Sequence, residues 1–135
     1  KSAFAVEVDN ARVLLRDASP QALVFLDEFG RGTSEQDGTA LAGAVLEALS
    51  ATGADVVFST HLHTLHERDL RGMDGWEWWR MGVEVGSAGL QLTYKLEKGR
   101  CSQSLGLLAS RRFGLPAAVV ARAEELLGIT RAPAA

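Results

Sequence analysis

The chain has 135 residues, 47% of them hydrophobic, and a formal net charge of −3 at pH 7. This length and composition suffice for a domain with a buried core, and the weak negative charge argues against a surface built mainly to bind nucleic acid or an anionic membrane. The single cysteine, Cys101, cannot form an internal disulfide and indicates a reducing compartment, and no apolar run approaches the roughly 20 residues that a membrane helix requires. The chain begins with Lys1 rather than Met, and we expect the upstream part of a longer protein to precede it.

The first 60 residues predict helix, strand, helix and strand in that order. Apolar residues at helical spacing predict a helix that begins after Ser2 as N-cap and ends at the Ser19-Pro20 pair. Residues 22–27 form a short, continuously apolar run, as in a strand covered on both faces. An amphipathic pattern over 40–49 predicts the second helix, and 54–60 predict a second buried strand. This succession predicts an α/β fold with a mainly parallel sheet.

The second half of the chain predicts a short helix, an antiparallel hairpin and two closing helices. These elements cover 61–70, 76–96 and 104–128, and the tail at 129–135 is expected to be loose. Alternation along the first hairpin strand places Trp76 and Trp78 on one face and Trp79 on the other. We expect these tryptophans to divide between core and surface; the alternative is a platform on which unpaired bases stack.

Polar side chains follow both apolar strands at the point where each strand ends. Asp27 and Glu28 close the first strand, and Thr60 and His61 close the second. Ligands of parallel α/β sheets bind at the carboxyl ends of the strands, so these residues are expected to share one crevice. Asp27 is suited to hold Mg²⁺, directly or through water, and Glu28 to orient or deprotonate a water. An isolated acidic pair is more often merely solvated, but the second strand ending in Thr-His favours the functional interpretation.

The loop after the first strand and the following histidines each allow a simpler interpretation. Ser34 or Asp37 can cap the helix after the glycine-rich loop. His61, His63 and His66 form H-x-H-x-x-H, a pattern that allows a zinc-site interpretation. Their positions at a strand end and a helix start give them no common face, so solvated or capping histidines are favoured for the latter two.

Four segments together resemble the ATPase domain of the MutS mismatch-repair family, a branch of the ABC-type ATPases. "LVFLDEFGRGTSEQDGTALA" is similar to its Walker B segment, "FSTHLHTL" to its histidine switch, and "KSAFAVEVDNARVLL" to the segment with its signature serine. "YKLEKGRCSQSLGLLASRRFGLPAAVVARAEELL" resembles its closing helix-turn-helix. The resemblance implies an ABC-type P-loop NTPase lobe with a mainly parallel sheet, an antiparallel hairpin and a C-terminal helix-turn-helix, with the N-terminal part of the domain missing.

The resemblance also implies a role for individual residues. Asp27 corresponds to the Walker B acid that associates with Mg²⁺, Glu28 to the catalytic carboxylate, and His61 to the switch histidine. Ser2 corresponds to the signature serine, which acts on a nucleotide held by the partner subunit, and a helix N-terminus with a hydroxyl suits a phosphate. Asp37 corresponds to an acid in a loop that crosses the dimer interface.

By the same resemblance, residues 1–100 are the C-terminal portion of the ATPase domain, 101–128 a helix-turn-helix dimerisation element, and 129–135 a flexible tail. The implied cofactors are ATP and Mg²⁺. The implied partners are a second MutS-type subunit, mismatched DNA bound through upstream domains, and downstream repair factors, with no membrane. The implied location is intracellular, in a bacterial cytoplasm or a eukaryotic nucleus or organelle.

The sequence departs from the family pattern mainly in lacking a phosphate-binding loop. No G-x-x-x-x-G-K-[ST] occurs in these 135 residues, so we expect this segment alone to be inactive and the loop to lie upstream of Lys1. Ala3 and Val8 stand where the family usually has Thr and Met. The "GRGTS" loop favours a mismatch-repair or organellar homologue over the branch that carries a nuclease.

Three other interpretations remain open. One is an SMC-like or transporter-type ABC lobe, which would carry an LSGGQ-like signature that this sequence does not have. Another is a non-hydrolysing dimerisation module. The closing helices, with Arg111, Arg112 and Arg122, also allow a DNA-binding helix-turn-helix. The Ala/Val-rich second helix favours docking onto protein instead.

Overall fold

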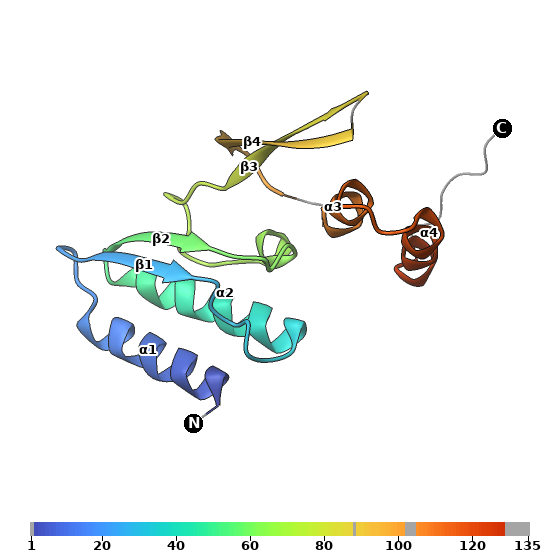
Figure 1. Cartoon of the computed structure of the whole chain (residues 1–135). Coiled ribbons are helices and arrows are strands. Elements are labelled where there is room, and N and C mark those ends of the chain that lie inside the picture. The colour runs from blue at the N-terminus through green and yellow to red at the C-terminus, as the bar shows by residue number, and fades with distance from the viewer. Residues whose placement is uncertain (1, 88, 102–104, 129–135) are drawn as a thin grey trace. The chain divides into compact units, whose positions relative to one another are not determined.

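The computed structural model describes residues 2–87, 89–101 and 105–128, which form two compact units, one ending at Trp76 and the other starting at Glu77. The first unit contains α1 (Ala3–Asp17), β1 (Leu23–Asp27), α2 (Glu35–Ala51), β2 (Asp55–Ser59) and the 3-10 turn η1 (Leu65–Glu67). The second contains β3 (Trp79–Gly86), β4 (Gly89–Lys98), α3 (Gly106–Arg112) and α4 (Ala117–Leu126). The predicted mixed α/β class is confirmed (Figure 1).

Serine side chains start both long helices of the first unit. The hydroxyl oxygen of Ser2 accepts a hydrogen bond from the N–H of Ala5 at 3.2 Å, which confirms the predicted N-cap of α1. The hydroxyl of Ser34 accepts from the N–H of Asp37 at 3.2 Å, so Ser34 is the N-cap of α2. Asp37 instead lies in the first helical turn, where a carboxylate complements the positive end of the helix dipole.

β1 and β2 form a parallel pair, as predicted, in a register that places Leu23 opposite Asp55 and Asp27 opposite Ser59. Val24 and Leu26 of β1 are buried, whereas the alternate residues Leu23 and Phe25 are 62% and 69% exposed. The expectation of strands covered on both faces is therefore wrong for the described residues. Within this unit α2 packs against β2, and the helices leave the opposite face of the sheet open (Figure 1).

The core of the first unit lies around α2. Leu46 and Leu49 of this helix and Leu65 of η1 are fully buried. The predicted helix over 61–70 is reduced to the three-residue turn η1, and the chain after it stays close to α2. A Cβ at Gly43 would lie 2.9 Å from Cδ2 of Leu70, so the side chain of Leu70 packs closely over α2 at this glycine.

Trp76 anchors the end of the first unit to α2 and lies outside the hairpin. Its indole N–H donates to the hydroxyl of Ser50 at 3.1 Å, and that hydroxyl donates to the carbonyl of Gly72 at 2.7 Å. β3 begins only at Trp79, so the predicted hairpin strand from Trp76 is wrong, and strand alternation does not place Trp76 and Trp78. These two side chains are nevertheless half-buried and Trp79 is 51% exposed, in line with the expected division between interior and surface. The side-chain hydrogen bond to α2 holds Trp76 outside the strand.

β3 and β4 form the predicted antiparallel hairpin, paired from Trp79 with Lys98 to Gly86 with Gly89. Its register shifts between Met81 and Val83, and on the opposing strand Tyr94 has a φ of 57°. Such a left-handed residue is typical of a β-bulge, which twists the strand that carries it.

The closing helices use their arginines within the second unit. Arg111 pairs with Glu124 at 3.1 Å, joining α3 to α4, and Arg122 pairs with Glu125 at 2.8 Å. Arg112 donates to the carbonyl of Leu90 in β4. These internal pairs favour a packed helix pair over a DNA-binding surface. The start of the predicted first helix at Ser104 and the tail at 129–135 lie outside the described residues.

None of the helices in the described part of the chain combines the length and the apolar character needed to cross a membrane.

Candidate functional site

The carboxyl ends of β1 and β2 bring Asp27 and Ser59 together. The two residues are opposite each other in the parallel register, and the hydroxyl of Ser59 donates to Oδ1 of Asp27. Carboxylate and hydroxyl oxygens are ligands that Mg²⁺ accepts in proteins. The donor set at this strand end therefore fits a magnesium ion held directly or through water.

Glu28 has an unusual backbone conformation directly after β1. Its φ is 55°, in the left-handed region that residues other than glycine rarely occupy. Its backbone N–H donates to the carbonyl of Ser59 at 2.8 Å, which extends the strand pairing by one residue. A conformation of this kind costs about 1–3 kcal/mol, and residues that retain it cluster at functional sites.

Both carboxylate oxygens of Glu28 have a partner. Nε2 of His61 contacts Oε1, and Nη1 of Arg31 donates to Oε2. The side chain of Glu28 is 26% exposed, whereas those of His61 and Arg31 are each 69% exposed. The prediction that Glu28 and His61 lie close together at the two strand ends is confirmed. Their roles in catalysis stay predictions. Arg31 was not among the predicted site residues, and the only signal for it was its position three residues after the acid in "EFGR".

The loop after Glu28 is held by the beginning of α1. Oε2 of Glu7 accepts a hydrogen bond from the N–H of Gly30 at 2.8 Å. A Cβ at Gly32 would lie 2.9 Å from Cα of Phe4, so the loop backbone lies directly against the first turn of α1. The helix that Ser2 caps therefore borders the loop that carries Arg31.

Two other predicted site residues have their contacts within their own helices. Ser2 and Asp37 make the cap hydrogen bonds already described, at the start of α1 and of α2. Among the described residues, no hydrogen bond or ion pair joins either of them to Asp27, Glu28 or His61. Their roles toward a nucleotide stay predictions.

The histidine-rich segment does not form a metal centre in the part of the chain that the structure describes. No group of three His, Cys, Asp or Glu side chains there is placed to hold a metal ion. His61 instead contacts Glu28, while His63 precedes η1 and His66 lies within it. The solvated or capping roles favoured for His63 and His66 stay predictions.

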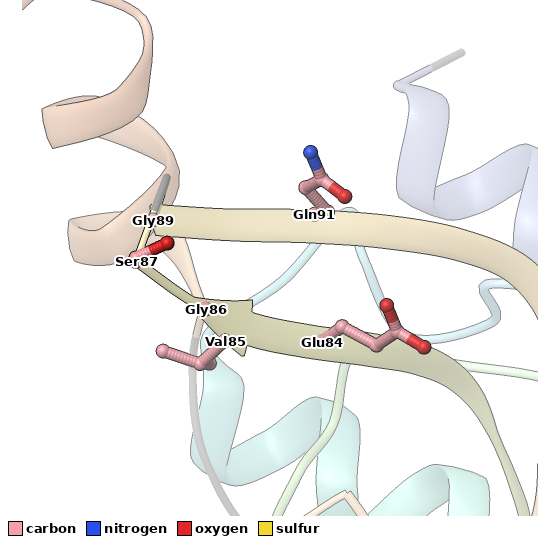
Figure 2. A pocket seen from close by; sticks show the side chains of 6 residues that line it. All are labelled: Glu84, Val85, Gly86, Ser87, Gly89 and Gln91. Atoms are coloured by element: carbon pink, nitrogen blue, oxygen red, sulfur yellow. The ribbon is translucent and has the colours of Figure 1, made fainter.

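A pocket at the turn of the β3–β4 hairpin contains none of the predicted site residues. Figure 2 shows the side chains of Glu84 and Gln91 extending from neighbouring strands, where the two residues are cross-strand partners. The lining residues are Glu84, Val85, Gly86, Ser87, Gly89 and Gln91.

Comparison with known proteins identifies the family of this chain. Residues 1–129 match the family model described as MutS domain V. The chain is 38% identical over 130 residues to the DNA mismatch repair protein MutS of Caldicellulosiruptor bescii, which covers 94% of this chain and 15% of that protein. It is 38% identical over 127 residues to MutS of Thermus aquaticus, with 94% and 15% coverage. It is 36% identical over 126 residues to the mitochondrial mismatch repair protein MSH1 of Arabidopsis thaliana, with 93% and 11% coverage.

The chain spans about 15% of the length of the bacterial relatives that it matches. The family model, in contrast, covers nearly all of the chain, and it includes the two strands whose ends carry Asp27, Glu28 and His61. The resemblance that the sequence segments carry is therefore confirmed, and this chain belongs to the MutS family, with residues 1–129 in its domain V.

Proposed function

We propose that this chain supplies the hydrolytic residues of a MutS-type ATPase, with Glu28 as the general base. Domain V is the ATPase domain of full-length MutS proteins, which implies ATP binding. The observation that carries the proposal is the pairing of Glu28, at the end of β1, with His61, which follows β2. A carboxylate positioned in this way can accept a proton from an attacking water, and His61 can hold that carboxylate or the water in place.

Asp27 and Ser59 have a different task in this proposal. Their oxygens face the same strand end and would hold Mg²⁺, directly or through a bound water. When bound, Mg²⁺ supplies positive charge that offsets the charge on nucleotide phosphates. The consecutive positions of Asp27 and Glu28 allow one carboxylate to serve the metal and the next to serve the water.

The remaining parts of the nucleotide site would come from elsewhere. The G-x-x-x-x-G-K-[ST] loop would belong to another part of a longer protein, since the sequence here contains none. Ser2, at the N-terminus of α1, would act on a nucleotide bound by a second MutS-type subunit, and Asp37 would lie near that interface. The helices α3 and α4 would form the dimerisation element at residues 101–128.

The proposed biological process is taken from the names of the relatives. They are DNA mismatch repair proteins, one of them mitochondrial. The longer protein would therefore bind mismatched DNA through other domains and act with downstream repair factors, in a bacterial cytoplasm or inside a eukaryotic organelle or nucleus. ATP and Mg²⁺ would be its cofactors.

The variant Glu28→Gln in the full-length protein tests the role of Glu28. Loss of general-base catalysis is expected to lower kcat by about 100-fold or more. Nucleotide binding should persist, because the amide keeps the size of the side chain, and bound ATP should remain uncleaved. Glu97→Gln is the matched control, since Glu97 also pairs with an arginine, Arg80, but in the hairpin. Unchanged turnover in Glu28→Gln would rule out the assignment.

The variant Ser2→Ala tests the proposed action across the dimer. Turnover should fall when the protein is dimeric and stay unchanged at concentrations where it is monomeric, measured by ATPase assays alongside sedimentation. An equal loss in the monomer would mean that Ser2 acts within its own subunit.

A further inference from the structure

We propose that Arg31 is a positioning residue for the carboxylate of Glu28. This inference rests on the proposed function, because it assigns Arg31 a part in the same hydrolytic site. Arg31 lies in the glycine-rich loop three residues after Glu28, and its guanidinium Nη1 donates to Oε2. His61 contacts the other oxygen, Oε1.

The two contacts together restrict more than the position of the carboxylate. The terminal torsion of a glutamate side chain is broad, so a carboxylate held at one oxygen can still rotate. A second donor on the other oxygen fixes the plane of the group as well. His61 alone would therefore leave the direction of the acceptor lone pairs undefined, and Arg31 supplies the missing constraint.

The arrangement still leaves Glu28 able to act as a base. Each carboxylate oxygen can accept two hydrogen bonds; Arg31 donates one to Oε2, and His61 lies in ion-pair contact with Oε1. A second lone pair on each oxygen thus remains for a water. Because the guanidinium is planar and always charged, it can hold the carboxylate in one orientation, whereas a lysine ammonium would act as a rotating point charge.

The loop geometry supports a defined place for Arg31. Glu7 accepts from the N–H of Gly30, and Gly32 lies against Phe4, so the backbone on both sides of Arg31 is fixed by α1. The side chain of Arg31 itself is 69% exposed. An exposed pair of this kind contributes little to folding, so removal of Arg31 should affect catalysis and leave unfolding almost unchanged.

The first experiment compares Arg31→Ala and Arg31→Lys with the unmodified full-length protein. The kcat is measured with Mg²⁺ and ATP, and the nucleotide affinity with a non-hydrolysable ATP analogue. Arg31→Ala should lower kcat between about tenfold and 100-fold, the size expected when a catalytic group is misplaced, with unchanged affinity. Arg31→Lys should recover only part of this loss. Arg16→Ala is the matched control, since Arg16 pairs with Asp17 and is 63% exposed in the same unit.

The second experiment places Arg31→Ala in the Glu28→Gln background and compares single-turnover rates. A residue that acts only through Glu28 loses its effect once that carboxylate is gone, so the double variant should match Glu28→Gln alone. A further drop in the double variant would show that Arg31 acts on the nucleotide itself. A weaker affinity in Arg31→Ala, or an unchanged kcat, would equally overturn the inference.

The outcomes separate this inference from the proposed function. If the unmodified full-length protein hydrolyses no ATP, the proposed function fails. If it does so, and Glu28→Gln abolishes turnover while Arg31→Ala does not lower it, only the role of Arg31 fails. Thermal unfolding of each variant shows whether the substitution disturbs folding. If Arg31→Ala does so, Arg31→Gln serves as a second neutral substitution with a longer side chain.

Discussion

The carboxylate of Glu7, in the second turn of α1, accepts a hydrogen bond from the backbone N–H of Gly30 at 2.8 Å. The two residues are 23 positions apart in the chain, and their contact is partly buried. It joins the helix that begins with Ser2 to the loop that begins with Glu28. A displacement of α1 would therefore act directly on the backbone beside the proposed base.

Replacing Glu7 tests how strongly this contact holds the loop. Glu7→Ala leaves the N–H of Gly30 without its acceptor and should lower the free energy of unfolding by about 1–3 kcal/mol. Glu7→Gln keeps an acceptor oxygen in place and should lose clearly less. Calorimetry of the full-length protein would measure the transition that contains this unit. Equal losses in the two variants would mean that the charge of Glu7, and not the hydrogen bond, is what matters.

Gly30→Ala is expected to destabilise the same loop through its backbone. Gly30 has a φ of +92°, and a Cβ there would lie 2.9 Å from the carbonyl oxygen of Gly38. The strain should cost about 1–3 kcal/mol and lower the unfolding temperature. Gly75→Ala is the control, because a Cβ at Gly75 would meet no atom within 4 Å. A loss of the same size at Gly75 would exclude this local explanation.

Ser34→Ala should weaken the start of α2. The hydroxyl of Ser34 accepts from the N–H of Asp37, and loss of such an N-cap costs about 1 kcal/mol. Ser34→Asp should restore the acceptor and most of the stability. Hydrogen exchange would report the change as faster exchange of the Asp37 amide in Ser34→Ala. An amide that exchanges at the same rate in both variants would contradict the cap.

Glu77 is expected to make the hairpin base sensitive to acid. The indole N–H of Trp79 donates to its carboxylate at 3.1 Å, and Lys98 lies 3.4 Å away. These two partners lower the pKa of Glu77 below its ordinary value of 4.5. A depressed folded-state pKa means that the unfolded chain binds more protons in this range. The contribution of Glu77 to stability is therefore present above pH 4.5 and is lost as the pH falls through the folded-state pKa.

An NMR titration of the Glu77 carboxyl carbon measures this effect. The midpoint should lie below 4.5 and rise toward that value in Trp79→Phe, which removes the indole donor, the largest single influence on the pKa of this carboxylate. Trp76→Phe is the control, since Trp76 donates to Ser50 instead. A midpoint that stays the same in Trp79→Phe would show that the indole does not hold the carboxylate.

The sequence was sufficient to predict the main elements and the meeting of Glu28 with His61. Helical and strand periodicities were strong over the first 60 residues, and N-cap chemistry identified Ser2. Parallel strands end at the same edge of a sheet, so polar residues after two such strands meet without any further information. The Trp79–Lys98 hairpin was also predicted in outline, from its two alternating segments and glycine-bounded turn.

Other features depended on tertiary contacts that no local pattern encodes. Trp76 looked like part of a strand, but its hydrogen bond to Ser50, 26 residues earlier, holds it against α2. Arg31 contacts a glutamate whose φ is left-handed, a conformation that sequence propensities do not predict for glutamate. Leu23 and Phe25 belong to an apolar run whose composition cannot show whether one face or two are covered.

The open face of the β1–β2 pair has a practical consequence for handling this segment. Leu23, Phe25 and Val57 are all more than half exposed, and among the described residues each of the two strands pairs only with the other. Unpaired strand edges beside apolar side chains are templates for intermolecular pairing. Concentrated solutions of the isolated segment should therefore self-associate, and a charged substitution such as Phe25→Lys should keep it dispersed.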